Sequence, residues 1–128
     1  MEIKLSKEES EEYFYNALCN GLGYISGYGL ELDNGSEYIN AQKRLNDKGV
    51  KGICYEDVLM EVLRGGDQLT LVDYDGDEER FSITLDDVHN KVQKVPVSHL
   101  LDMVEERDDA VTADVILQTV FLGEVIFG

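Results

Sequence analysis

The sequence is poor in the residues that build metal knuckles, disulfide frameworks and membrane helices. It has no tryptophan, one proline, two cysteines and two histidines among 128 residues. Cys19 and Cys54 are too few and too far apart for a disulfide framework or a metal knuckle, and their apolar neighbours predict small buried side chains. No apolar run approaches the roughly 20 residues of a membrane-spanning helix. The first residues also lack the apolar segment of a secretory signal. We therefore expect a cytoplasmic protein that does not bind membranes.

Positive charge is equally scarce. The chain has 27 aspartate and glutamate residues against 11 lysine and arginine residues, a formal net charge of −16. A field of that sign repels phosphate groups, so we expect no direct binding to nucleic acid. The acidic side chains either keep the protein soluble or are presented to a protein partner. A sharper hypothesis is that they mimic the phosphate spacing of DNA.

Motifs of catalysis and cofactor binding are also missing. The chain contains no G-x-S-x-G, no phosphate loop and no dinucleotide-binding glycine pattern. The stretch from Asp73 to Glu79 starts like a calcium loop, but Glu78 and Thr84 stand where an EF-hand needs glycine and a bidentate glutamate. We interpret it as a solvated hairpin tip.

The two histidines, His89 and His99, lack the spacing of a helical ligand pair. We therefore predict no enzymatic activity, no cofactor and no metal. A small ligand-binding or metal-binding protein that uses the histidines and the hairpin acids is kept as an alternative.

What the chain does have is a strongly apolar C-terminal segment, Thr112–Gly128. Its apolar residues follow the i, i+3, i+4, i+7 spacing of a core-facing helix, and further apolar residues widen the stripe until little polar surface is left. Thr112 is the predicted N-cap and Gly123 the predicted end. The residues of the stripe are Ala113, Ile116, Leu117, Val120 and Phe121.

Other local signals predict helices around it. Ser6 and Glu9 form a capping box for a helix that we expect to end near Gly21–Gly23. Further helices are predicted over 36–47 and 55–64, from Thr84 to before Pro96, and from Ser98 onward. Tyr24–Leu32 is predicted as a strand or extended loop and Val50–Cys54 as a short strand.

Leu69–Leu85 is predicted to be a β-hairpin. Pairing Leu71 with Phe81 and Leu69 with Ile83 keeps their side chains on one face, and this register needs a longer loop than a two-residue Asp-Gly turn. The hairpin needs a third strand or a helix on its apolar face. We predict one domain, 1–128, of the α+β class, helix-rich, with this small antiparallel sheet packed against the buried C-terminal helix.

The C-terminal half resembles an uncharacterised family of small acidic proteins encoded by tailed phages and prophages. The resemblance implies an origin in a phage or mobile element and no particular reaction. After the double glycine, relatives often carry a polar-aromatic stretch, whereas this chain has Asp67-Gln68-Leu69. The segments that carry the resemblance are Asp57-Val58-Leu59 through Arg64-Gly65-Gly66, Asp108 to Asp114, Leu117-Gln118 and Gly123 to Gly128.

The favoured function is a non-catalytic binding or regulatory protein that acts on a protein partner. A DNA-mimic inhibitor of a nuclease or DNA-binding protein is the second hypothesis. The apolar C-terminal end leaves monomer and homodimer open as oligomeric states. The predicted interaction surface consists of Asp73, Asp75, Asp77, Glu78, Glu79, Glu105, Glu106, Asp108 and Asp109.

Overall fold

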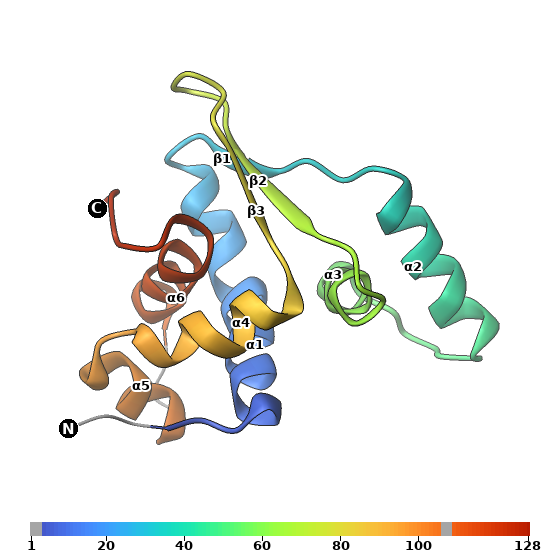
Figure 1. Cartoon of the computed structure of the whole chain (residues 1–128), viewed down its shortest axis with the longest axis horizontal. Helices are drawn as coiled ribbons and strands as arrows, with labels where there is room; N and C mark the ends of the chain where they lie inside the picture. Colours follow the sequence, from blue (N-terminus) through green and yellow to red (C-terminus); the bar gives the residue numbers. More distant parts are fainter. Residues whose placement is uncertain (1–3, 106–108) are drawn as a thin grey trace.

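In the computed structural model of the 128-residue chain, helices surround a small three-stranded sheet (Figure 1). The structure describes residues 4–105 and 109–128. The fold is helix-rich α+β, as predicted. Its elements are α1 (Lys7–Ser26), β1 (Leu30–Leu32), α2 (Ser36–Asp47), α3 (Tyr55–Arg64), β2 (Leu69–Asp73), β3 (Arg80–Ile83), α4 (Leu85–Lys91), the 3₁₀ turn η1 (Val92–Lys94), α5 (Val97–Val104) and α6 (Ala110–Leu122).

The C-terminal helix α6 is buried on every side. All residues from Thr112 to Phe121 are buried, and the helix ends at Gly123, whose φ of 86° places it in the left-handed region that glycine tolerates. The predicted N-cap was wrong. Asp109 caps the helix by accepting a hydrogen bond from the Thr112 backbone N–H at 3.0 Å, so α6 begins earlier than expected.

Helix α1 starts as predicted and continues further. The Ser6 hydroxyl accepts from the Glu9 backbone N–H at 3.1 Å, and the Glu9 carboxylate accepts from the Ser6 N–H at 3.0 Å. Gly21 and Gly23 do not end the helix, which runs to Ser26, and only Leu30–Leu32 of the predicted extended segment is a strand. Tertiary packing overrides the low helix propensity of the two glycines.

Gly21 is a point of close approach between α1 and α6. A β-carbon built on Gly21 would lie 2.9 Å from the Ala113 β-carbon and 2.9 Å from a Leu117 methyl group. Further along the same contact, the rings of Phe14 and Phe121 pack with centroids 6.1 Å apart. The absence of a side chain at Gly21 therefore allows the two helices to pack at backbone distance.

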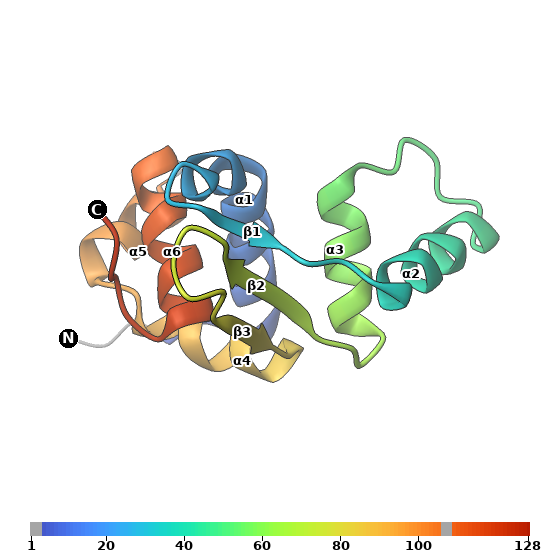
Figure 2. The same ribbon diagram turned by 90° about the horizontal axis from the view of Figure 1, so that it is seen from above.

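The sheet has the predicted register and gains the third strand that the hairpin needs. Leu69 pairs with Ile83 and Leu71 with Phe81, and β1 adds to the other edge of β2, giving the order β1-β2-β3. Leu69, Leu71 and Ile83 are buried, whereas the Thr70 and Ser82 hydroxyls hydrogen-bond at 2.8 Å on the opposite face. The sheet lies across α1 and α6 (Figure 2).

Helices α2 and α3 connect the neighbouring strands β1 and β2 and stand to one side of the other elements (Figure 2). Helix α3 packs between α1 and α2. Its buried Glu61 carboxylate forms ion pairs with Arg44 at 3.2 Å and Lys48 at 3.4 Å, both from α2. Val50–Cys54, predicted as a strand, is an irregular link between the two helices.

The C-terminal segment folds back onto α6 through Gln118, whose side chain is 1% exposed. Its amide oxygen accepts from the backbone N–H groups of Ile126 and Phe127, both at 2.8 Å, and its amide nitrogen donates to Phe127 O at 3.0 Å and to Asp114 at 2.8 Å. The Phe127 ring stacks on Tyr28. These contacts cover α6 within the chain, so a homodimer is not needed to bury it and stays a prediction.

None of the helices in the described ranges has the length and apolar character required to cross a membrane. That finding agrees with the absence of a long apolar run in the sequence.

The close approach at Gly21 predicts opposite effects for two glycines of the same helix. Gly21→Ala should lower the free energy of unfolding by about 1–3 kcal/mol, because the new methyl group overpacks the contact with α6. Gly23→Ala meets nothing within 4 Å and should raise it by about 0.5–1 kcal/mol through reduced backbone entropy. Urea unfolding of both variants measures the difference, and equal stabilisation by both would contradict the packing assigned to Gly21.

Candidate functional site: an acidic cleft along helix α3

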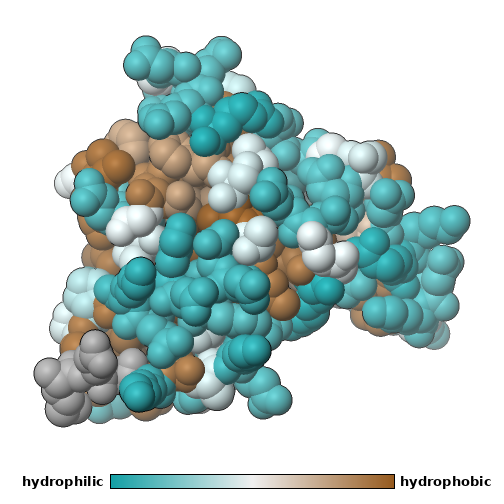
Figure 3. All heavy atoms as spheres, in the orientation of Figure 1, coloured by the Kyte–Doolittle hydropathy of each residue, from teal (hydrophilic) through white to brown (hydrophobic). Residues whose placement is uncertain are grey.

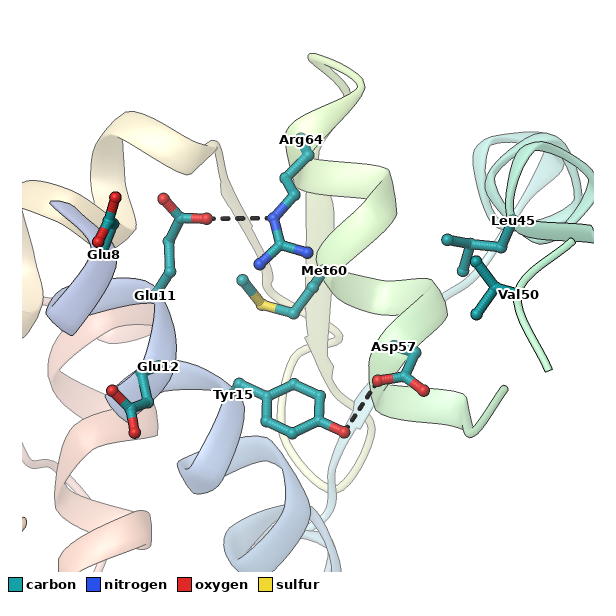
Figure 4. Close-up of a pocket in the computed structure, with 9 residues that line it drawn as sticks. All are labelled: Glu8, Glu11, Glu12, Tyr15, Leu45, Val50, Asp57, Met60 and Arg64. Atoms are coloured by element: carbon teal, nitrogen blue, oxygen red, sulfur yellow. Dashed lines mark hydrogen bonds and ion pairs between the residues drawn. The ribbon is translucent and has the colours of Figure 1, made fainter. Parts of the chain in front are cut away.

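A cleft of about 490 Å³ runs along α3. Its residues follow helical spacing on two elements: α1 contributes positions i, i+3, i+4 and i+7, and α3 contributes positions i, i+3 and i+7. Figure 4 shows α3 lying between the side chains of α1 and those of α2 and the following link. The lining residues are Glu8, Glu11, Glu12 and Tyr15 from α1, Asp57, Met60 and Arg64 from α3, and Leu45 and Val50 from α2 and its link.

Two polar contacts join α1 to α3 across the cleft. The Tyr15 hydroxyl donates to the Asp57 carboxylate at 2.9 Å, and Arg64 Nε donates to Glu11 at 3.1 Å (Figure 4). The second Glu11 oxygen lies 2.9 Å from His89 Nε2 on α4. Asp57 also accepts from the Cys54 backbone N–H at 3.1 Å and thereby caps α3. Glu11 and Asp57 therefore hold the cleft together.

These contacts change the acidity of the groups that make them. Burial alone would raise the pKa of Glu11, but the hydrogen bonds from His89 and Arg64 outweigh it and leave that pKa below its ordinary value of 4.5. The backbone and side-chain hydrogen bonds with Cys54 lower the pKa of Asp57, despite partial burial. The hydrogen bonds of Tyr15 with Cys54 and Asp57, together with burial, raise the pKa of the phenol. Glu11 and Asp57 are thus charged and Tyr15 is neutral at pH 7.

Two further carboxylates of the cleft are exposed and uncommitted. Within residues 4–105 and 109–128, neither Glu8 nor Glu12 forms an ion pair with a basic side chain. Four carboxylates against the single guanidinium of Arg64 leave the lining with a formal charge of −3. Leu45 and Val50, on the other side of α3, add an apolar wall to the lining (Figure 4). The cleft therefore suits a guest that carries positive charge next to aliphatic carbon.

The structure places the predicted interaction surface in two separate regions. The first five residues, 73–79, lie at the hairpin tip, which is hydrophilic in Figure 3, and Glu105 and Asp109 lie at the far end beside α5. Two of the acids have local structural roles, because Asp73 accepts from the Gly76 N–H at 3.1 Å and Asp109 caps α6. Glu106 and Asp108 lie outside the described residues.

The two histidines have different partners. His89 Nε2 contacts Glu11, as above, whereas His99 Nδ1 lies 3.2 Å from the Thr112 hydroxyl. The buried His89 Nδ1 has no hydrogen-bond partner among the described residues, which favours the tautomer that carries its proton on Nε2. In the same part of the chain, no three histidine, cysteine, aspartate or glutamate side chains are placed to hold a metal ion.

The prediction for the cysteines was wrong. Cys19 and Cys54 are both exposed free thiols, although each has apolar neighbours in the sequence. Cys19 lies on α1 outside its buried stripe, and Cys54 lies at the N-cap position of α3. Helical periodicity would have indicated exposure at Cys19, because the buried stripe passes through Phe14, Ala17 and Leu18.

The sequence did not reveal the cleft. The acids at the start of α1 also suit the positive end of a helix, which by itself accounts for their position. The available signal was the stripe Glu8, Glu11, Glu12, Tyr15, which continues one polar face beyond the first turn. That the stripe faces α3 follows from tertiary packing alone.

Comparisons with protein-family models, with curated proteins and with solved structures found no match to this chain. The resemblance of the C-terminal half to small acidic phage proteins accordingly stays a prediction.

The ion pair of Glu11 with Arg64 and its hydrogen bond from His89 predict how stability depends on pH. Glu11→Gln should lower the free energy of unfolding at pH 7 by roughly 1–2 kcal/mol, the size of a hydrogen bond to a charged group. Because the pKa of Glu11 is lower in the folded chain than in the unfolded chain, its contribution is complete above about pH 4.5 and is lost as the pH falls through the folded-state pKa. Urea unfolding across acidic and neutral pH should show the wild-type and variant curves converging in acid.

Glu12→Gln is the matched control, one residue further along α1 and without an ion pair. It should change stability by less than about 0.5 kcal/mol at pH 7. A gap between wild type and Glu11→Gln that stays constant into the acid range would contradict the role assigned to the Glu11 carboxylate.

Proposed function

We propose that this protein is a non-catalytic binding protein whose acidic cleft along α3 takes a basic segment of a partner protein. The observation that supports the proposal is the pairing, in one cleft, of the uncommitted carboxylates of Glu8 and Glu12 with an apolar wall. A lysine or arginine side chain has the matching chemistry, since its aliphatic stem packs on apolar carbon while its charged end meets carboxylates.

The contacts within the cleft support binding of such a segment. Glu11 and Asp57 are already held by Arg64, His89 and Tyr15, so the guest need not displace them to find a charged partner. The exposed Glu8 and Glu12 carboxylates lose less solvation than buried ones when they pair with a cation. The overall charge of −16 also steers a basic partner toward the protein.

Four ion-paired basic side chains of the described residues leave the cleft acidic. Arg44 and Lys48 pair with Glu61 between α2 and α3. Arg64 pairs with Glu11, and Arg80 pairs with Asp33 near the sheet. Three of these four basic groups therefore neutralise acids other than those of the cleft, and Arg64 leaves Glu8 and Glu12 unpaired. A guest must supply the missing positive charge.

The proposal predicts that charge removal in the cleft weakens binding of a basic peptide. The probe is a short amidated peptide of alternating lysine and alanine, titrated into the full chain by calorimetry. Glu8→Gln combined with Glu12→Gln should raise the Kd about tenfold, equivalent to about 1.4 kcal/mol. The same peptide with acetylated lysines should not bind, because acetylation removes the charge.

The matched control changes the net charge by the same amount at the hairpin tip. Asp77→Asn combined with Glu79→Gln should raise the Kd less than about twofold if the cleft is the binding site. Equal weakening by the two double variants would indicate attraction by the general acidic field, as DNA mimicry by the whole surface requires, and would contradict the assignment to the cleft. Failure of the wild type to bind the peptide would contradict the proposal itself.

A further inference from the structure

The two cysteines, distant in sequence, meet at one tyrosine. Cys19 lies one helical turn after Tyr15 on α1, a spacing that places both side chains on the same helix face. Cys54 Sγ lies 3.4 Å from the Tyr15 hydroxyl oxygen. Because the Tyr15 proton is donated to Asp57, the Cys54 thiol is the donor in the contact with that oxygen.

The acidity of Cys19 is consistent with a position beside the same tyrosine. Burial raises the pKa of Cys19, and the negative charge of Glu56 on α3 adds to the effect. The Tyr15 side chain acts on that pKa in the opposite direction, and Cys54 raises it further. Both thiols are also exposed to solvent, so a small reagent can reach them.

We propose that Cys19 and Cys54 form a dithiol pair that a small-molecule disulfide, such as oxidised glutathione, converts into an intramolecular disulfide between α1 and the start of α3. The sulfurs must then contact each other in place of the Tyr15 hydroxyl. Cys54 follows the irregular link 48–54, which contains Gly49 and Gly52 at positive φ. That link allows Cys54 to shift without breaking a helix.

The intramolecular disulfide forms in two thiol–disulfide exchange steps. One cysteine thiolate attacks oxidised glutathione, forms a mixed disulfide and releases one reduced glutathione. The other cysteine, as its thiolate, attacks the protein sulfur of that mixed disulfide and releases the second glutathione. The protein loses two electrons and two protons, and one oxidised glutathione becomes two reduced molecules.

The disulfide would join α1, which carries the carboxylates Glu8, Glu11 and Glu12 of the cleft, to the start of α3. Cys19 and Cys54 lie beside the Tyr15–Asp57 contact, and the bond would add a covalent link to that hydrogen bond between α1 and α3. The separation of the two helices would then be fixed. This inference is independent of the proposed function, because the bond can form whether or not a partner binds.

The experiment equilibrates the full chain with mixtures of reduced and oxidised glutathione, quenches it with acid, alkylates free thiols and measures the intact mass. The expected product is a monomer with neither alkylation nor glutathione attached. The equilibrium constant for closing the disulfide should be at least tenfold larger for the folded chain than for the chain in concentrated urea, because folding brings the thiols together.

A matched variant moves one thiol by a single residue. Cys19→Ser combined with Asn20→Cys keeps the spacing along the chain almost unchanged but turns the thiol about 100° around α1. Its equilibrium constant for closing the disulfide should fall at least tenfold below that of the wild type. Equal closure by the variant, or a wild type that yields mainly glutathione adducts or linked dimers, would overturn the proposal.

Discussion

The packing of α1 against α6 at Gly21 is the contact on which the rest of the structure depends. Helix α6 is buried from Thr112 to Phe121 and must therefore be covered on all sides. Helix α1 covers it most closely, and β3, α4, α5 and the C-terminal segment cover the remaining faces. A side chain at Gly21 would separate the two helices, and every element packed on α6 would have to follow.

Two polar side chains of this core, Gln118 and Asp114, are tolerated because hydrogen bonds satisfy them. Gln118 uses both its amide oxygen and its amide nitrogen, and Asp114 accepts from Gln118 and from the Tyr28 hydroxyl. Burial of Tyr28, together with its hydrogen bond to Asp114, raises the pKa of Tyr28 to about 12. The acids outside the core also differ in whether they have a partner. Most that approach another element serve as caps or pair with a basic residue, whereas Glu8 and Glu12 do neither.

Local patterns predicted the elements that depend on local physics. The capping box at Ser6, the helix start at Thr84, the helix Tyr55–Arg64 and the register of Leu71 with Phe81 were confirmed, because caps and alternation act over a few residues. The predicted end of α1 near Gly21–Gly23 was wrong, because Gly21 packs against Ala113, 92 residues later in the chain. The cleft and the contact of Cys54 with Tyr15 depend on how α3 docks on α1, and no local pattern encodes that docking.

The position of α2 has a mechanical consequence. Helices α2 and α3 together form the connection between the adjacent strands β1 and β2. Helix α2 is attached mainly to α3, through the Glu61 ion pairs and the buried Ala41. Elements with so few buried apolar neighbours open at the lowest free energy in a native protein. The apolar wall of Leu45 and Val50 can consequently swing outward while α1 and the sheet stay in place. The cleft can widen to fit side chains of different size with little change in the free energy of unfolding of the whole chain.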